Sequence, residues 1–229
     1  MDIDEIKGVT FDFGDTLALG DLDKEDFQNK LFLYLRNLGF SGRKSLLSKA
    51  RNRMLGILMK VRRHNREMRL EDLYQGMLFE LGLHPEREAI DYIHQLYIQS
   101  FKVELITGVE KILEFLSDKY HLAVISNAMS EVPRQAIKRF GLEKYLNSIV
   151  ISRDLGIRKP DPEIFKFTLK NLGIESNEAI HIGDSLEYDV QGAKNAGMKA
   201  IWIKRNNEEM TLSQPDYTIH SLQELDSLL

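Results

Sequence analysis

Apolar residues along this chain follow two patterns, a helical one between residues 19 and 102 and an alternation of short strands with helices from residue 106 onward. In the first region they recur at helical spacing. The four runs are Phe27, Leu31, Leu35 and Leu38; Leu47, Met54, Leu58 and Val61; Leu70, Leu73, Met77 and Leu81; and Ile90, Ile93 and Tyr97. Breaks fall at residues 39–42, 62–69 and 81–85. We therefore expect about four helices packed on one another.

Short apolar strands alternate with helices in the rest of the chain. Strands are predicted at residues 6–13, 121–125, 148–152, 179–182, 200–203 and 217–219, and helices at 108–117, 130–140, 162–172, 186–196 and near the C-terminus. Asp161 before Pro162 is a typical helix start, and Gly197 is a typical helix end. This alternation predicts an α/β fold with a doubly wound, mostly parallel sheet covered on both faces.

The two patterns divide the chain into two predicted domains. Residues 1–18 and 103–229 form an α/β core domain, and residues 19–102 form an all-helical domain inserted after the first strand. In parallel sheets of this kind, ligands bind beyond the carboxyl ends of the strands. Functional residues are therefore expected where the predicted strands end.

Composition narrows the functional classes. The 229 residues are 43% hydrophobic, carry a net charge of −4 and have a pI near 5.9, which argues against a nucleic-acid partner. The chain has no cysteine, so disulfides, thiolate metal sites and a cysteine nucleophile are excluded. The acidic N-terminus lacks the features of a signal peptide, and no apolar run reaches membrane-spanning length. We expect a cytoplasmic protein with no membrane partner, either a monomer or a homodimer.

Asp12 ends the first predicted strand, and a Gly14-Asp15-Thr16 turn follows it. An ionised carboxylate fixed at a strand end can attack phosphorus and form an aspartyl-phosphate, provided that a cation screens the phosphate charge. Backbone amides of the turn can hold phosphoryl oxygens. A plain turn that caps the strand explains this segment alone equally well, so the other strand ends decide between the two interpretations.

Three further segments carry polar side chains at or near strand ends. Ser126 and Asn127 follow the second predicted strand, and both can donate hydrogen bonds to a phosphoryl oxygen. Lys159 precedes a proline at the entry to a helix, where a fixed positive charge can neutralise a carboxylate and a phosphoryl group. Asp184 follows a later strand and lies five positions before Asp189. Carboxylates in this arrangement suit Mg²⁺.

Taken in this order, the four segments resemble the motifs of the haloacid dehalogenase-like (HAD) superfamily, and in particular its phosphatases with a C1 helical cap. The matching residues are Asp12-Phe13-Gly14-Asp15-Thr16, Ile125-Ser126-Asn127, Lys159-Pro160-Asp161-Pro162-Glu163-Ile164-Phe165 and Gly183-Asp184-Ser185-Leu186-Glu187-Tyr188-Asp189. The resemblance implies a Rossmann-like core, a helical cap, and Mg²⁺-dependent hydrolysis of a small phosphorylated metabolite.

The resemblance also implies roles for individual residues. Asp12 is assigned as the nucleophile. The phosphate is assigned to Ser126, Asn127 and Lys159. The metal is assigned to Asp12, the Gly14 carbonyl, Asp184 and Asp189. For Asp189 two roles stay open. It either supports the metal through water or holds Lys159 in place.

One position departs from the phosphatase pattern. Phosphatases of the superfamily carry a second aspartate two positions after the nucleophile, which protonates the leaving oxygen and then activates water, whereas this chain has Gly14. General acid–base help is typically worth about 10²–10⁴-fold, so its loss predicts slow turnover. Asp15 could take over this catalytic role if the turn shifts slightly, although it could equally serve only to cap the turn.

Two alternative functions therefore stay open. One is a 2-haloacid dehalogenase or another carbon-centred hydrolase, because dehalogenases of the superfamily also lack this aspartate and need no Mg²⁺. The Asp184 to Asp189 pattern argues against it. The other is a phosphate-binding regulatory protein with little turnover, because Gly14 replaces the usual acid.

The remaining polar residues receive simpler interpretations. A basic cluster in the helical region could bind an anionic substrate, but cations near a helix C-terminus and in a solvated linker are the preferred interpretation. Its members are Lys60, Arg62, Arg63, His64, Arg66 and Arg69. Arg158 is expected to be solvated. His181 is expected to pack within or beside a strand and to take no part in the chemistry.

Overall fold

The structure is a computed structural model that describes residues 5–84, 86–205 and 214–229. At its centre is a six-stranded sheet with the strand order β5-β4-β1-β6-β7-β8, in which every neighbouring pair is parallel. Its strands are β1 (Gly8–Phe11), β4 (His121–Ser126), β5 (Ser148–Ile151), β6 (Ala179–Gly183), β7 (Lys199–Ile203) and β8 (Tyr217–Ile219). Residues 1–4 and 206–213 of the predicted core domain, and residue 85 in a predicted helix break, lie outside the described residues.

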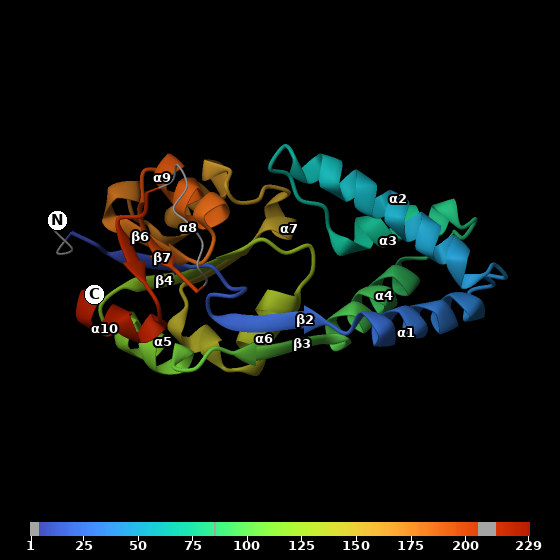
Figure 1. Cartoon of the computed structure of the whole chain (residues 1–229), viewed down its shortest axis with the longest axis horizontal. Coiled ribbons are helices and arrows are strands. Elements are labelled where there is room, and N and C mark those ends of the chain that lie inside the picture. The colour runs from blue at the N-terminus through green and yellow to red at the C-terminus, as the bar shows by residue number, and fades with distance from the viewer. Residues whose placement is uncertain (1–4, 85, 206–213) are drawn as a thin grey trace.

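Helices cover both faces of this sheet (Figure 1). One hydrophobic cluster joins the sheet to α5 (Val109–Ser117), α6 (Val132–Arg139) and α10 (Leu225–Leu228). A second cluster joins the other face to α8 (Pro162–Leu172), the π-helical turn η3 (Leu186–Gln191) and α9 (Gly192–Asn195). The side chains of β1 alternate accordingly, because Val9 and Phe11 belong to the first cluster and Thr10 points the opposite way. The predicted doubly wound α/β fold is confirmed.

Four helices between β2 and β3 form a second lobe at the other end of the molecule (Figure 1). They are α1 (Lys24–Asn37), α2 (Lys44–Arg62), α3 (Leu70–Glu80) and α4 (Arg87–Gln99). The apolar positions of the four predicted runs build a separate core that includes Leu31, Leu58, Met77 and Ile93. Full burial of one such side chain contributes about 1.5–3 kcal/mol, so the lobe has its own source of stability. None of the described helices is long and apolar enough to cross a membrane.

An antiparallel ribbon, absent from the sequence prediction, connects the two lobes. It pairs β2 (Ala18–Leu22) with β3 (Phe101–Leu105), so that Gly20 lies opposite Val103. The predicted domain boundaries fall at the ends of this ribbon or within it. Its middle positions in β2 are exposed, and this explains why no apolar period marks it. The remaining short elements are η1 (Leu142–Tyr145), α7 (Ser152–Leu155), η2 (Ser176–Glu178) and η4 (Leu222–Glu224).

Three central strands end side by side at one edge of the sheet. The register pairs Phe11 of β1 with Val124 of β4 and with Ile182 of β6. Asp12, Ser126 and Asp184 follow these positions within two residues. The sheet therefore brings three of the predicted site residues to the same edge.

Candidate active site

Asp12 and Lys159 meet in the interior of this edge. Asp12 is 8% exposed and Lys159 is 1% exposed, and Lys159 Nζ lies 2.5 Å from Asp12 Oδ1. Burial raises the pKa of the Asp12 carboxyl above its ordinary value, and Lys159 offsets part of that rise. Burial opposes the charge of Lys159, but the carboxylates of Asp12 and Asp189 outweigh it and raise the pKa of the ammonium group. Lys159 is thus a fixed cation that favours the ionised form of Asp12.

Asn127 holds the backbone of the lysine. Its Nδ2 donates to the Lys159 carbonyl oxygen at 3.0 Å, and the Lys159 backbone N–H donates to Asn127 Oδ1 at 2.9 Å. The side chain predicted to clamp phosphate therefore also positions the loop that carries Lys159. Its amide has a second N–H, and Asn127 lines the pocket described below.

Asp189 accepts hydrogen bonds through both oxygens. Its Oδ1 lies 2.6 Å from Lys159 Nζ and 3.2 Å from His181 Nε2, and its Oδ2 accepts from the Ser185 backbone N–H at 3.0 Å. Although burial alone would raise it, Lys159 and His181 hold the pKa of Asp189 well below its ordinary value. A Cβ on Gly183 would lie 2.3 Å from Asp189 Cγ, so glycine is required for this approach. The geometry favours the role in which Asp189 holds Lys159.

Three carboxylates gather at the strand ends. One oxygen from each of Asp12, Asp184 and Asp189 lies within 4.8 Å of the others. Burial, followed by the charges of Asp189 and Asp15, raises the pKa of Asp184 to about 6. An excess of carboxylate oxygens over cations is the environment that Mg²⁺ binds, so these residues fit a divalent cation. The oxygens of Asp189 already have donors, so Asp12 and Asp184 are the carboxylates that could hold it. The carbonyl of Gly14, which lines the pocket with Asp12, is a further candidate ligand.

Backbone hydrogen bonds close the turn that follows β1. The Ala18 N–H donates to the Phe13 carbonyl oxygen, and the Asp15 N–H donates to the Ala18 carbonyl oxygen. Asp15 has φ 55°, in the left-handed region, and is exposed on the pocket wall. Gly14 lies outside that region, and a Cβ there would meet no atom within 4 Å. The position of the missing aspartate therefore has room for the first atom of a side chain.

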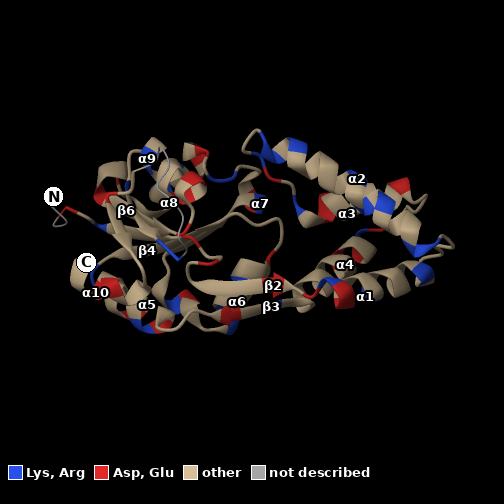
Figure 2. Cartoon of the chain, in the orientation of Figure 1, with Lys and Arg blue, Asp and Glu red and all other residues tan. Residues whose placement is uncertain are grey.

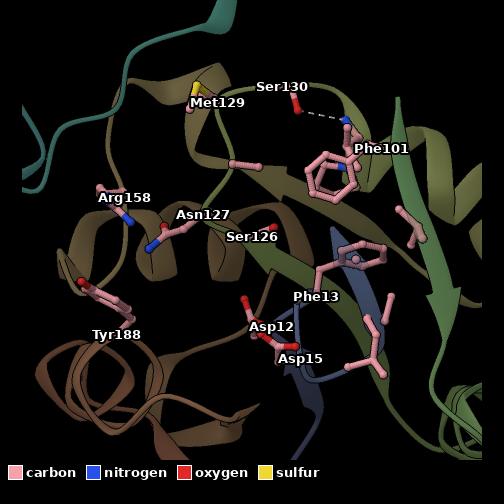
Figure 3. Close-up of a pocket in the computed structure, with 18 of the residues that line it drawn as sticks. Asp12, Phe13, Asp15, Phe101, Ser126, Asn127, Met129, Ser130, Arg158 and Tyr188 are labelled. Carbon is pink, nitrogen blue, oxygen red and sulfur yellow. Dashed lines mark hydrogen bonds between the residues drawn. The ribbon is translucent and has the colours of Figure 1, made fainter. Parts of the chain in front are cut away.

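A pocket of about 410 Å³ opens at these strand ends, within the size range of small-molecule sites. Figure 3 shows Asp12 and Ser126 between two unlike walls of the pocket. One wall is aromatic and is formed by Phe13 and Phe101, and the other carries the polar groups of Asn127, Arg158 and Tyr188. Ser126 is 5% exposed. The pocket therefore brings the predicted nucleophile and the predicted phosphate-binding serine onto one surface.

Two arginines also line this pocket, although the sequence favours a solvated role for both. Of the six-residue basic cluster, Arg62 is the member that lines the pocket in the described part of the chain. The expectation that Arg158 is solvated is wrong, because its side chain is only 12% exposed. Its position directly before Lys159 was the available signal.

His181 is a further site residue that the sequence interpretation missed, and a polar side chain inside an apolar strand was its only signal.

Comparisons with known proteins identify the family of the chain. The haloacid dehalogenase-like hydrolase family matches residues 46–203. The chain is 30% identical over 157 residues to the phosphoserine phosphatase of Thermus thermophilus, a match that covers 68% of this chain and 63% of that protein. It is 25% identical over 226 residues to the glyceraldehyde 3-phosphate phosphatase of Methanocaldococcus jannaschii, covering 96% and 95%. The chain spans 52–63% of the lengths of the first three curated relatives that it matches.

A solved structure adds a similarity over the full length. The crystal structure of a 2-haloacid dehalogenase from Pseudomonas syringae pv. Tomato DC3000 matches with a TM-score of 0.76 and 28% identity, and the match covers 97% of both chains. The sequence family covers more than half of the chain and includes the segments that carry Lys159, Asp184 and Asp189. The chain therefore belongs to the haloacid dehalogenase-like hydrolase family.

Proposed function

We propose that this chain is a Mg²⁺-dependent phosphatase that hydrolyses a small phosphate monoester through an aspartyl-phosphate on Asp12. The observation that carries the proposal is the contact of one buried ammonium group, Lys159 Nζ, with both Asp12 and Asp189. It supplies a positioned cation beside a carboxylate at a strand end, which phosphoryl transfer needs. The two curated relatives described above are named as phosphatases, and this supports the same reaction type.

In the proposed reaction, the Asp12 carboxylate attacks phosphorus in line with the ester oxygen. A bond forms between Asp12 and phosphorus, the ester bond breaks, and the alcohol takes up a proton as it leaves. Water then cleaves the aspartyl-phosphate, releases inorganic phosphate and restores Asp12. Lys159 screens the negative charge, while Ser126 Oγ and the turn amides other than that of Asp15 donate to phosphoryl oxygens.

A divalent cation would complete the charge balance of this site. Mg²⁺, when bound, supplies further neutralisation of phosphate charge, and Asp12, Asp184 and the Gly14 carbonyl are the groups that would hold it. Proton transfer is the weaker part of the machinery because Gly14 has no acidic side chain. Asp15 lines the same pocket and is the candidate for this role.

A panel of phosphate esters tests the proposal. We expect the purified protein to release inorganic phosphate in the presence of Mg²⁺ and to lose this activity in EDTA. Asp12→Asn should be inactive, whereas Asp21→Asn, at an exposed position outside the pocket, should match the parent. If Asp12→Asn hydrolyses the esters as fast as the parent, the mechanism proposed here is wrong.

A second candidate function is carbon-centred hydrolysis of a 2-haloacid, favoured by the TM-score of 0.76 to the Pseudomonas syringae dehalogenase. In that reaction the Asp12 carboxylate would displace a halide from carbon and no metal would be needed. The cluster of Asp12, Asp184 and Asp189 speaks for the phosphatase. Halide release from 2-chloropropionate in EDTA, combined with no hydrolysis of phosphate esters, would replace the first candidate by the second.

A further inference from the structure

The pocket wall carries Arg158, whose side chain is largely buried. Its Nε is shielded from solvent and has no hydrogen-bond acceptor among the described residues. Its contacts are an ion pair with Glu67 Oε2 at 3.9 Å and the ring of Tyr188, whose centre lies 5.4 Å from Arg158 Cζ. Burying such donors without acceptors is unfavourable. Figure 3 shows Arg158 on the same side of the pocket as Tyr188 and Asn127.

The carboxylate beside Arg158 already accepts hydrogen bonds from other groups. Arg62 Nε and Nη2 donate to the two oxygens of Glu67 at 3.0 and 3.2 Å. A backbone N–H and a serine hydroxyl donate to the same carboxylate. Burial, together with the nearby charge of Arg62, lowers the pKa of Arg158, and the exposed Glu187 is a further acid in its surroundings. Two guanidinium groups therefore share one buried carboxylate.

The two arginines reach the pocket from different lobes. Arg62 ends α2, a helix that carries six Lys or Arg residues and no Asp or Glu, as its blue segments in Figure 2 show. Arg158 lies in the loop before α8. The backbones of these segments contact each other. The Arg158 N–H donates to the Asn65 carbonyl oxygen at 3.0 Å, and Arg66 forms an isolated antiparallel β-bridge with Ile157. Two arginines with one buried carboxylate between them thus lie where the lobes meet, on the wall of the pocket that holds the nucleophile.

We infer that Arg62 and Arg158 bind a second anionic group of the substrate, a carboxylate or a phosphate, while Asp12 reacts with its phosphoryl group. The inference rests on the proposed function and narrows its substrate class to small phosphate monoesters with a second anion. Planar guanidinium groups match the oxygen geometry of both anions. The aromatic wall opposite is suited to the carbon chain between them. An anion held by both arginines also connects the helical lobe to the core.

Matched ester pairs test the inference. O-phosphoserine and O-phosphoethanolamine differ by one carboxylate, and fructose 1,6-bisphosphate and fructose 6-phosphate differ by one phosphate. We expect the parent to prefer the member with the extra anion in at least one pair by about tenfold or more in kcat/KM, the size of a charge-assisted interaction. The pair that responds identifies the anion. Arg158→Gln should remove the preference and Arg158→Lys should keep part of it, whereas Arg63→Gln, exposed and outside the pocket lining, should keep it whole.

Binding measurements separate this inference from the proposed function. Calorimetric titration of the Asp12→Asn protein with the same four compounds measures the preference without turnover. If the parent hydrolyses the esters but neither pair shows a preference in kinetics or in binding, the inference is wrong and the phosphatase proposal stands. If no ester is hydrolysed and the titrations still show a preference that Arg158→Gln removes, the proposed function fails and the anion site stands. A preference that survives Arg158→Gln overturns the inference.

Discussion

His181 links Asp189 to the first strand, because its Nε2 lies 3.2 Å from Asp189 Oδ1 and its Nδ1 lies 2.8 Å from Thr10 Oγ1. A carboxylate only accepts hydrogen bonds, so Nε2 donates to Asp189 and Nδ1 accepts from the threonine hydroxyl when the ring is neutral. Burial lowers the pKa of His181, which favours that neutral form. The ring also packs edge-on against the ring of Phe165, with 5.1 Å between the two ring centres. His181 is thus a packing residue that also helps to fix Asp189.

Removing this link should destabilise the protein in a measurable, non-additive way. His181→Leu takes one donor from buried Asp189 and leaves the Thr10 hydroxyl with only a long contact, 3.5 Å, to the Ile180 carbonyl oxygen. We therefore expect it to lower the free energy of unfolding by about 1–3 kcal/mol. Thr10→Val alone should cost less. In the double variant no hydroxyl needs a partner, so its cost should be smaller than the sum of the two single costs. Urea unfolding followed by circular dichroism measures all three. Strict additivity would show that the two side chains are not coupled.

Restoring an aspartate at Gly14 should accelerate turnover. A Cβ at this position meets no atom within 4 Å, so the backbone surroundings do not obstruct the start of a side chain. We expect Gly14→Asp to raise kcat for an alkyl phosphate, up to the about 10²–10⁴-fold that general acid–base catalysis contributes. Gly14→Asn has nearly the same size without the acid and should bring no such gain. Equal acceleration by both variants would mean that proton transfer does not limit the reaction.

Asp15 is the second place where proton transfer can be tested. Asparagine tolerates the left-handed backbone conformation that Asp15 adopts at φ 55°, so Asp15→Asn removes the acid and leaves the turn intact. If Asp15 supplies the missing acid and base, kcat for an alkyl phosphate should fall by about 10²-fold or more. Unchanged kcat would sink the substitute-acid hypothesis and leave Asp15 with a role in capping the turn.

The sequence predicts the sheet and the strand-end residues because their signals are local. Asp12 and Asp184 each follow directly after a buried apolar strand. The strand register pairs Phe11 with Ile182 and so brings the two carboxylates to the same edge of the sheet. The β2–β3 ribbon could not be predicted in this way. Its residues in β2 are mostly exposed, so no apolar period distinguishes them from a loop.

The roles of several side chains depended on long-range contacts that no spacing rule contains. Asn127 is predicted as a phosphate ligand from its place after a strand, and the structure adds a second role, because its amide also pairs with the backbone of Lys159, 32 residues away. Arg158 looks solvated in its loop, and only the docking of the helical lobe buries it beside Glu67. For Asp189, the sequence leaves two roles open, and the contact with Lys159 Nζ at 2.6 Å favours one of them.

Removing the charge of Lys159 should slow the reaction. Lys159→Met keeps the length of the side chain but leaves Asp12 and Asp189 without their shared cation, so the pKa of Asp12 should rise further. We expect kcat to fall by about 10²-fold or more and to recover in part as the pH rises, since Asp12 then ionises again. Lys166→Met, at an exposed position on α8, is the matched control. Parental kcat in Lys159→Met would contradict the role assigned to the lysine.

Glu71 should make the stability of the protein depend on pH, because it joins α3 of the helical lobe to Arg153 of α7. Its Oε1 lies 2.7 Å from Arg153 Nη2 and 3.0 Å from His94 Nδ1. Burial alone would raise the pKa of Glu71, but His94 and Arg153 outweigh it and lower the value from 4.5 to about 2. A folded-state pKa below the ordinary one means that the ionised form stabilises the protein above about pH 4.5, and that this contribution is lost as the pH falls toward 2. Glu71→Gln should therefore be less stable than the parent near neutral pH, and the difference in free energy of unfolding should shrink below about pH 4.5. Urea titrations of both proteins from about pH 7 to about pH 3.5 measure it, with Glu88→Gln, exposed on α4, as the control. A difference that stays constant over this range would show that Glu71 acts through packing and not through its charge.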